Sequence, residues 1–212
     1  MTTVTRRLDT PTLPWTIAVI VSALAFYVWG SSLEWRFAGL SPYQLFPLFG
    51  LLAFSLMWGH YVVGMLCRLF LDRGKLDDYF RLTGYAVLVL ILLHPGILVY
   101  QRFRDGFGLP PHSYETYVAP GLAWVTLLGT VSLLIFLAFE LHRWFKDASW
   151  WKYVAAAGDL AMLAVFYHGL ELGTHTHVQW FRVVWYFYGV TLVGCLLYKY
   201  WFILRKRDKV GA

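Results

Sequence analysis

Residues 81–100 form the stretch RLTGYAVLVLILLHPGILVY, which is apolar almost throughout except for the imidazole of His94, with Pro95 directly after it. A helix needs about 20 mostly apolar residues to cross the hydrocarbon core of a bilayer. The stretch therefore predicts a membrane-spanning helix over residues 82–100. An ionisable group inside hydrocarbon is costly, so His94 is a candidate functional residue.

The composition extends this expectation to the whole chain. Hydrophobic residues make up 59% of the 212 residues, charged residues make up 14%, and the mean hydropathy is +0.56. A soluble domain has about 25% charged residues. The net charge of +6 is divided into short blocks between apolar runs, which indicates membrane topology and no nucleic-acid partner. Cys67 and Cys195 lie in or beside apolar runs without metal-ligand spacing, so we expect buried free thiols.

The predicted fold class is all-α, an integral membrane bundle of six transmembrane helices in contact with lipid. We expect one domain over residues 1–212, because the chain has no room for a separate soluble module. The expected crossings are residues 15–29, 43–71, 82–100, 117–141, 151–172 and 178–204.

Lys and Arg side chains predict how these helices face, because cytoplasmic loops carry the excess of positive charge. Only Arg36, Arg102, Arg104 and Arg182 fall on one side of the predicted bundle. The remaining cations fall on the other side: Arg6, Arg7, Arg68, Arg73, Lys75, Arg81, Arg143, Lys146, Lys152, Lys199, Arg205, Lys206, Arg207 and Lys209. We therefore expect both termini in the cytoplasm and a multi-pass protein of the inner or plasma membrane.

Two embedded histidines are expected at similar depth. His94 comes thirteen residues after Arg81, about 20 Å into the membrane, and His168 comes sixteen residues after Lys152, about 24 Å into it. Two neutral imidazoles that face each other at one depth can be the axial ligands of a haem iron. The alternative is that each histidine only hydrogen-bonds a neighbouring helix.

His60 differs because it lies eight residues before Arg68, about 12 Å from the cytoplasmic edge. No other embedded histidine shares that depth. We interpret it as a packing or hydrogen-bonding residue, with a place beside an inner cofactor as the alternative.

The motifs around both histidines are similar to those of a known family. Arg81, Leu82, Gly84 and His94, in RLTGYAVLVLILLH, and His168, in WWKYVAAAGDLAMLAVFYHGL, resemble the third and fifth helices of the ferric reductase-like transmembrane domain. That family includes the haem-binding membrane subunit of the bacterial periplasmic methionine sulfoxide reductase system, the NADPH oxidases and the six-transmembrane metalloreductases. The resemblance implies one haem b in the outer half, with His94 and His168 as ligands of its iron.

The departures from the family pattern concern the inner half of the membrane. Two-haem members carry a second histidine below each ligand, where this chain has Ala155 on one helix and Arg81 or Phe80 on the other. The resemblance then implies a single-haem arrangement with FMN or FAD in the inner half. The candidates for such an inner flavin or haem site are Arg81, Asp159 and His60. Asp159 either pairs with Arg81 or bonds a flavin ring.

The expected function is electron transfer from the cytoplasmic side to an extracytoplasmic acceptor, by an oxidoreductase or the haem subunit of one. The chain has no nucleotide-binding motif, so the donor is a flavin, a quinol or a partner flavin reductase. A basic outer mouth would attract an anionic acceptor such as chelated ferric iron, and a periplasmic reductase is the other acceptor. This mouth would consist of Arg102, Arg104, His112, His175, His177 and Arg182. The alternative function is a haem-free transporter with an intramembrane proton or metal path through His60, Asp159 and His168.

Overall fold

The computed structural model describes residues 11–141, 145 and 147–210, except for the side chains of Lys75 and residues 205–210. Most of these residues are helical and none is in a strand, which confirms the all-α fold class. Four cations that contribute to the predicted orientation, Arg6, Arg7, Arg143 and Lys146, lie outside the described residues.

Five helices in this part of the chain are long and apolar enough to cross a membrane, as expected for a multi-pass membrane protein. They are α1 (Thr12–Ser32), α2 (Pro42–Leu69), α3 (Asp77–Arg104), α7 (Trp151–Leu172) and α8 (Gln179–Val210). The apolar helix α5 (Ala123–Phe139) is shorter, with 17 residues. Short connecting helices are η1 (Arg73–Leu76), α4 (His112–Glu115) and η2 (Thr174–His177).

The crossing expected over residues 117–141 is shorter at both ends than predicted. Helix α5 begins only at Ala123, after Pro120 and after Gly121, which has a φ of +86°. A positive φ is outside the helical region, so the turn at Gly121 separates Tyr117 from the helix. The 17 residues of α5 extend about 26 Å, slightly less than a hydrocarbon core of about 30 Å.

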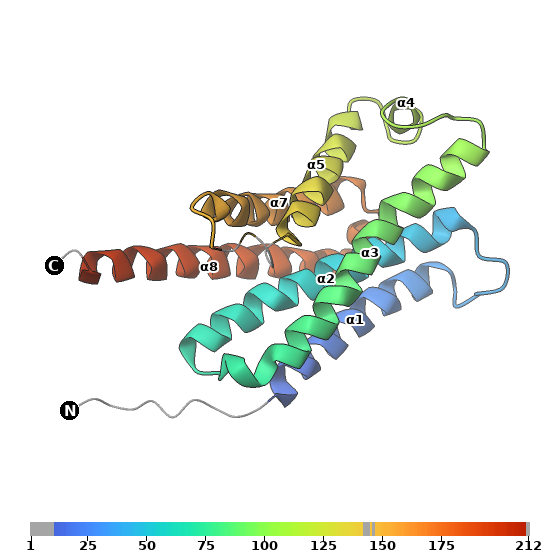
Figure 1. Ribbon diagram of the computed structural model, residues 1–212. Coiled ribbons are helices and arrows are strands. Elements are labelled where there is room, and N and C mark those ends of the chain that lie inside the picture. Colours follow the sequence, from blue (N-terminus) through green and yellow to red (C-terminus); the bar gives the residue numbers. More distant parts are fainter. Residues whose placement is uncertain (1–10, 142–144, 146, 211–212) are drawn as a thin grey trace.

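Helix α2 lies at the centre of the bundle, against α1, α3 and α8, whereas α5 packs on α7 (Figure 1). The start of α2 is fixed by a capping box, in which the Ser41 backbone N–H donates to the Gln44 side chain at 2.9 Å. The Trp29 indole donates to the Gln44 carbonyl at 2.7 Å, which ties the end of α1 to this cap. The Ser41 bond satisfies a backbone N–H that the start of a helix leaves without an intrahelical partner.

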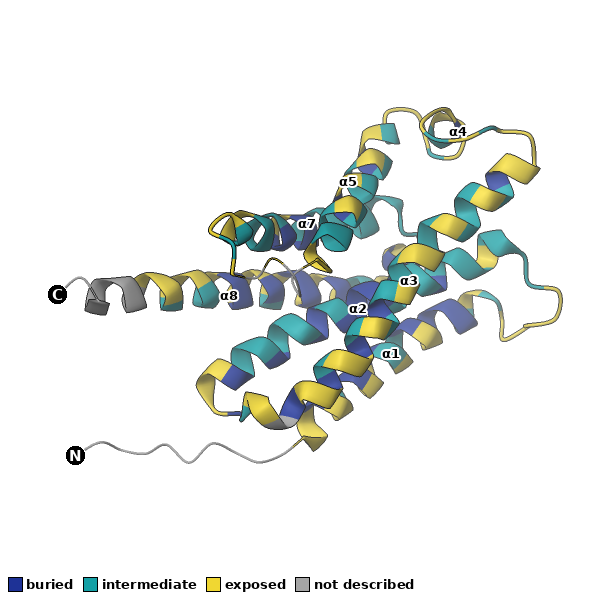
Figure 2. Cartoon of the chain, viewed as in Figure 1, coloured by how far each residue is buried: buried dark blue, intermediate teal, exposed yellow. Residues whose placement is uncertain are grey.

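Large aromatic side chains fill the core between α2, α7 and α8. Trp185 is 2% exposed, and its ring lies 4.4 Å from that of Phe54 and stacks 6.0 Å from that of Phe166. Both cysteines are buried, and neither forms a disulfide within the described residues. The outward faces of α3 and α8 keep many exposed apolar residues (Figure 2), which suits contact with lipid.

Candidate functional site

A cavity of about 630 Å³ separates the α2–α3 pair from the α5–α7 pair. Its walls come from all four helices, from η2 and the segment before α5, and from Trp185 of α8. The volume falls in the range of about 300–1,000 Å³ that is usual for cofactor sites. Most of the wall is apolar, and both His94 and His168 belong to it.

His94 enters the cavity wall from α3 and is anchored on α2. Its Nδ1 donates to the main-chain carbonyl of Phe46 at 2.8 Å. The ring lies over Gly50, where an added Cβ would be only 2.7 Å from the imidazole Cε1 atom. Gly50 is one helical turn after Phe46, so the missing side chain exposes the carbonyl to a group from the neighbouring helix.

His168 repeats this arrangement in the other helix pair. It comes from α7, and its Nδ1 donates to the main-chain carbonyl of Val125 on α5 at 2.9 Å. Its ring lies over Gly129, where an added Cβ would be 2.8 Å from Cε1. Val125 and Gly129 are again four residues apart, so the two pairs use the same construction.

The two hydrogen bonds decide which imidazole nitrogen is available. A carbonyl oxygen can only accept, so Nδ1 of His94 and of His168 carries the proton and Nε2 keeps its lone pair. Within the described residues, neither Nε2 has a hydrogen-bond partner. Metal-ligating histidines characteristically donate the other ring N–H to an oxygen, which fixes the ring and the tautomer. Both side chains therefore have the form that an axial ligand requires.

Sequence reasoning missed Gly50 and Gly129. A glycine inside an apolar helix weakens it and suggests a close approach by another group, but this signal does not say which group approaches. The chain has several other helical glycines, including Gly64 and Gly96, where an added Cβ would meet nothing within 4 Å.

His60 has different surroundings. Its Nε2 bonds the Thr83 hydroxyl at 2.6 Å, and that hydroxyl donates in turn to the carbonyl of Tyr79 at 2.5 Å. The Thr83 oxygen therefore accepts from His60, and Nε2 is occupied. The imidazole also packs edge-on against Tyr79 and Phe80. These contacts agree with the interpretation of His60 as a packing and hydrogen-bonding residue.

Asp159 and Arg81 are not paired with each other. Arg81 forms an exposed ion pair with Asp78 at 2.7 Å. Asp159 is 4% exposed and accepts from Lys199 at 2.5 Å. It also accepts from the hydroxyls of Tyr200 and Tyr61, at 2.7 Å and 3.0 Å. Of the two alternatives for Asp159, pairing with Arg81 is wrong, because α8 supplies the cation from Lys199.

The residues expected at the outer mouth have separate environments. His112 lies on the surface, 3.7 Å from Glu115, and Arg182 bonds Tyr186. His175, in η2, is 9% exposed and bonds the Ser32 hydroxyl at 3.0 Å. Burial lowers the pKa of His175 below its usual value of about 6.5, so the side chain is neutral at pH 7.

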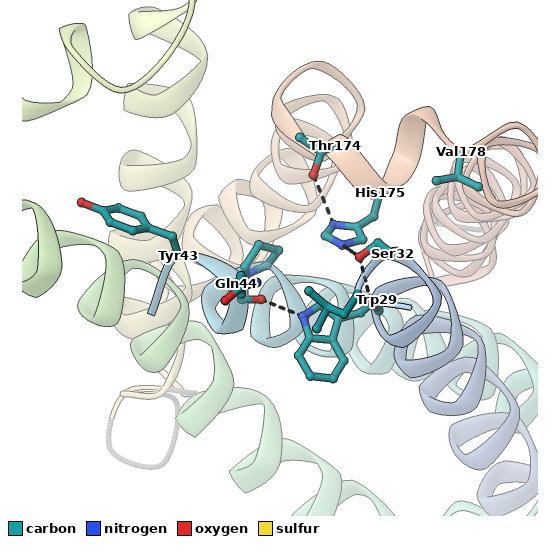
Figure 3. A pocket seen from close by; sticks show the side chains of 9 residues that line it. Trp29, Ser32, Tyr43, Gln44, Thr174, His175 and Val178 are labelled. Atoms are coloured by element: carbon teal, nitrogen blue, oxygen red, sulfur yellow. Dashed lines mark hydrogen bonds between the residues drawn. The ribbon is translucent and has the colours of Figure 1, made fainter. Parts of the chain in front are cut away.

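A second pocket, of about 260 Å³, lies beside the cavity at the end of α1 and the start of α2 (Figure 3). It shares wall residues with the cavity, among them Tyr43, Thr174 and His175. Figure 3 shows the His175 ring between Ser32 and Thr174, with the Trp29 indole directed at Gln44. The end of the cavity beside this pocket is therefore partly polar.

The candidate site consists of two matched imidazoles on opposite helix pairs of one apolar cavity. Within the described residues, neither this cavity nor any other place brings together three His, Cys, Asp or Glu side chains that could hold a metal ion. Comparison with protein-family models, with curated proteins and with solved structures gives no match for this chain.

Proposed function

We propose that this protein binds one haem b between His94 and His168 and carries electrons across the membrane to an extracytoplasmic acceptor. The observation that supports this proposal is the matched pair of imidazoles, each held by a carbonyl over a glycine on opposite walls of one cavity. This arrangement agrees with the likeness of the two histidine motifs to the ferric reductase-like transmembrane domain.

The chemistry of the cavity suits a porphyrin. Two imidazoles are too few to hold a bare metal ion, which needs about four ligands, whereas a porphyrin brings four nitrogens of its own. The wall contains flat and branched apolar side chains, such as Phe46, Leu98 and Phe136, that can pack on a macrocycle. Haem bound there supplies one-electron chemistry, and the protein tunes it through ligands, hydrogen bonds and local dielectric.

The chain contributes positioning and exclusion of water. The Phe46 and Val125 carbonyls hold the two rings by their Nδ1–H groups, so that each Nε2 stays unprotonated. The apolar wall keeps the dielectric constant low around the site. Every electron that crosses moves charge in the membrane field, which changes its free energy by about 2.3 kcal/mol per 100 mV.

The topology that we propose has six crossings, with α5 as the short one, and both termini in the cytoplasm. The start of α1 and the end of α8 lie toward the same side of the bundle in Figure 1, which supports this topology. In the inner or plasma membrane, the cavity would then open toward the extracytoplasmic face. The donor would be a flavin, a quinol or a partner reductase on the cytoplasmic side, and the acceptor chelated ferric iron or a periplasmic protein.

An absorption spectrum of the detergent-solubilised protein tests the proposal. We expect a Soret band and, after dithionite reduction, the bands of low-spin haem. His94→Ala and His168→Ala should each remove or disrupt this spectrum. His112→Ala is the matched control, because that side chain is exposed and pairs with Glu115 on the surface. Unchanged spectra in both ligand variants would refute the assignment. A colourless protein that moves metal ions or protons in liposomes would support the transporter instead.

A further inference from the structure

Arg102 is a buried cation near the cavity. It lies on α3, eight residues after His94 and therefore about 12 Å further along the helix axis. Only 7% of the surface of Arg102 is exposed. Arginine stays charged at every physiological pH, so this position holds a permanent positive charge away from water.

The contacts of the Arg102 guanidinium are with neutral groups. Its Nη2 donates to the carbonyl of Ser113 at 3.4 Å and to the hydroxyl of Thr116. Its central carbon lies 3.6 Å from the centroid of the Phe107 ring. The Nε atom is buried and has no hydrogen-bond partner. At least one strong donor of this side chain is therefore left without an acceptor.

Arg102 forms no ion pair with any carboxylate of the described residues. Asp105, three residues further along, accepts from the Tyr43 hydroxyl and from the Gln101 amide instead. A buried charge is costly unless an opposite charge and hydrogen bonds compensate it. The described part of the chain thus contains a buried cation that has no carboxylate within ion-pair distance.

Two tyrosines connect Arg102 to the cavity. The guanidinium carbon lies 5.4 Å from the centroid of the Tyr117 ring and close to the Tyr43 hydroxyl. Both tyrosines belong to the cavity wall, and their rings stack with centroids 6.2 Å apart. Arg102 is therefore placed directly behind the wall, at the end of the cavity beyond His94.

We propose that Arg102 is the anion-binding residue of this cavity and holds a propionate carboxylate of the bound haem. The inference rests on the proposed function, because the propionates are the only negative groups of haem b. A planar guanidinium matches a carboxylate with two parallel N–H donors. The arginine would orient the porphyrin through its carboxylate, whereas His94 and His168 would hold its iron.

Haem with esterified propionates tests this role. Full-length protein prepared without haem is titrated with haem b and with its dimethyl ester, which has no carboxylate. We expect the wild-type protein to bind the free acid about 10- to 100-fold more tightly than the ester, the range for a charge-assisted hydrogen bond. Arg102→Met should lose this preference. Arg102→Lys, which keeps the charge but lacks the two parallel N–H donors, should retain part of it. Arg104→Met, an exposed cation on the same helix, should keep the wild-type preference.

Three other results would overturn the role of Arg102 or the proposed function. An equal preference for the free acid in wild-type and Arg102→Met protein, with only a lower unfolding temperature, would overturn the inference and leave Arg102 as a loop anchor. Slower reoxidation of the reduced variant by ferric citrate, at unchanged preference for free-acid haem, would overturn it in favour of a diffusible carboxylate acceptor. Failure of the wild-type protein to bind either porphyrin would overturn the proposed function itself.

Discussion

Alanine at Gly50 or Gly129 should weaken haem binding at the proposed site, although both histidines are kept. An alanine Cβ at Gly50 would lie 2.7 Å from Cε1 of His94, whereas ordinary contacts begin at 3.4 Å. The imidazole must then withdraw by about 0.7 Å, the difference between these two distances. A shift of that size stretches the 2.8 Å bond to Phe46 beyond the usual limit of about 3.2 Å.

The expected loss follows from both effects. Overpacking costs about 1–3 kcal/mol, and loss of the hydrogen-bond partner of a metal-ligating histidine lowers metal affinity about 10- to 100-fold. We therefore expect weaker haem binding of that order in Gly50→Ala and in Gly129→Ala, measured by haem titration of the apoprotein, with altered low-spin bands.

Gly64→Ala on α2 and Gly96→Ala on α3 are matched controls, because an added Cβ there meets nothing within 4 Å. They should bind haem as the wild-type protein does. Wild-type affinity and spectra in Gly50→Ala and Gly129→Ala would refute the role that we assign to the glycines.

Two further predictions concern stability. Lys199→Met leaves the buried Asp159 carboxylate without its cation and should lower the unfolding free energy by on the order of 3 kcal/mol, measured by thermal unfolding in detergent. Asp159→Asn in the same chain should recover part of this loss. A double variant whose loss equals the sum of the two single losses would contradict the pairing. Because burial lowers the pKa of His175, the unfolded chain binds its proton more readily, so stability is full above about pH 6.5 and falls as the pH drops below that value. His175→Gln should make the unfolding temperature less dependent on pH between about pH 7.5 and 5, and an unchanged pH dependence would exclude His175 as its source.

The helices could be predicted from the sequence because membrane spans are set by length and hydropathy. The span expected over residues 151–172 matches α7 at both ends. Helix α3 extends beyond residues 82–100 at both ends, to Asp77 and Arg104, because charged residues can continue a helix outside hydrocarbon. The late start of α5 follows from Gly121, whose positive φ cannot be recognised from hydropathy.

The candidate site could be predicted only in part. The counts of residues from the helix ends placed His94 and His168 at similar depth, and they line one cavity. Their carbonyl partners, on α2 and α5, depend on how helices rotate and pack, which one sequence does not reveal. The same limit applies to the partner of Asp159. The position of Lys199 in the sequence indicates the cytoplasmic charge excess, but its long side chain reaches back into the bundle and pairs with Asp159.

The oxygen that holds each imidazole belongs to the peptide backbone. No codon change can delete a carbonyl, and a peptide oxygen keeps the same protonation in acid and in alkali. Replacing the side chain of Phe46 or Val125 therefore leaves the acceptor of His94 or His168 in place, and neither acceptor titrates as an aspartate would. A mutation at Gly50 or Gly129 can still push an imidazole away from its carbonyl. The positions most sensitive to mutation are therefore two residues that have no side chain.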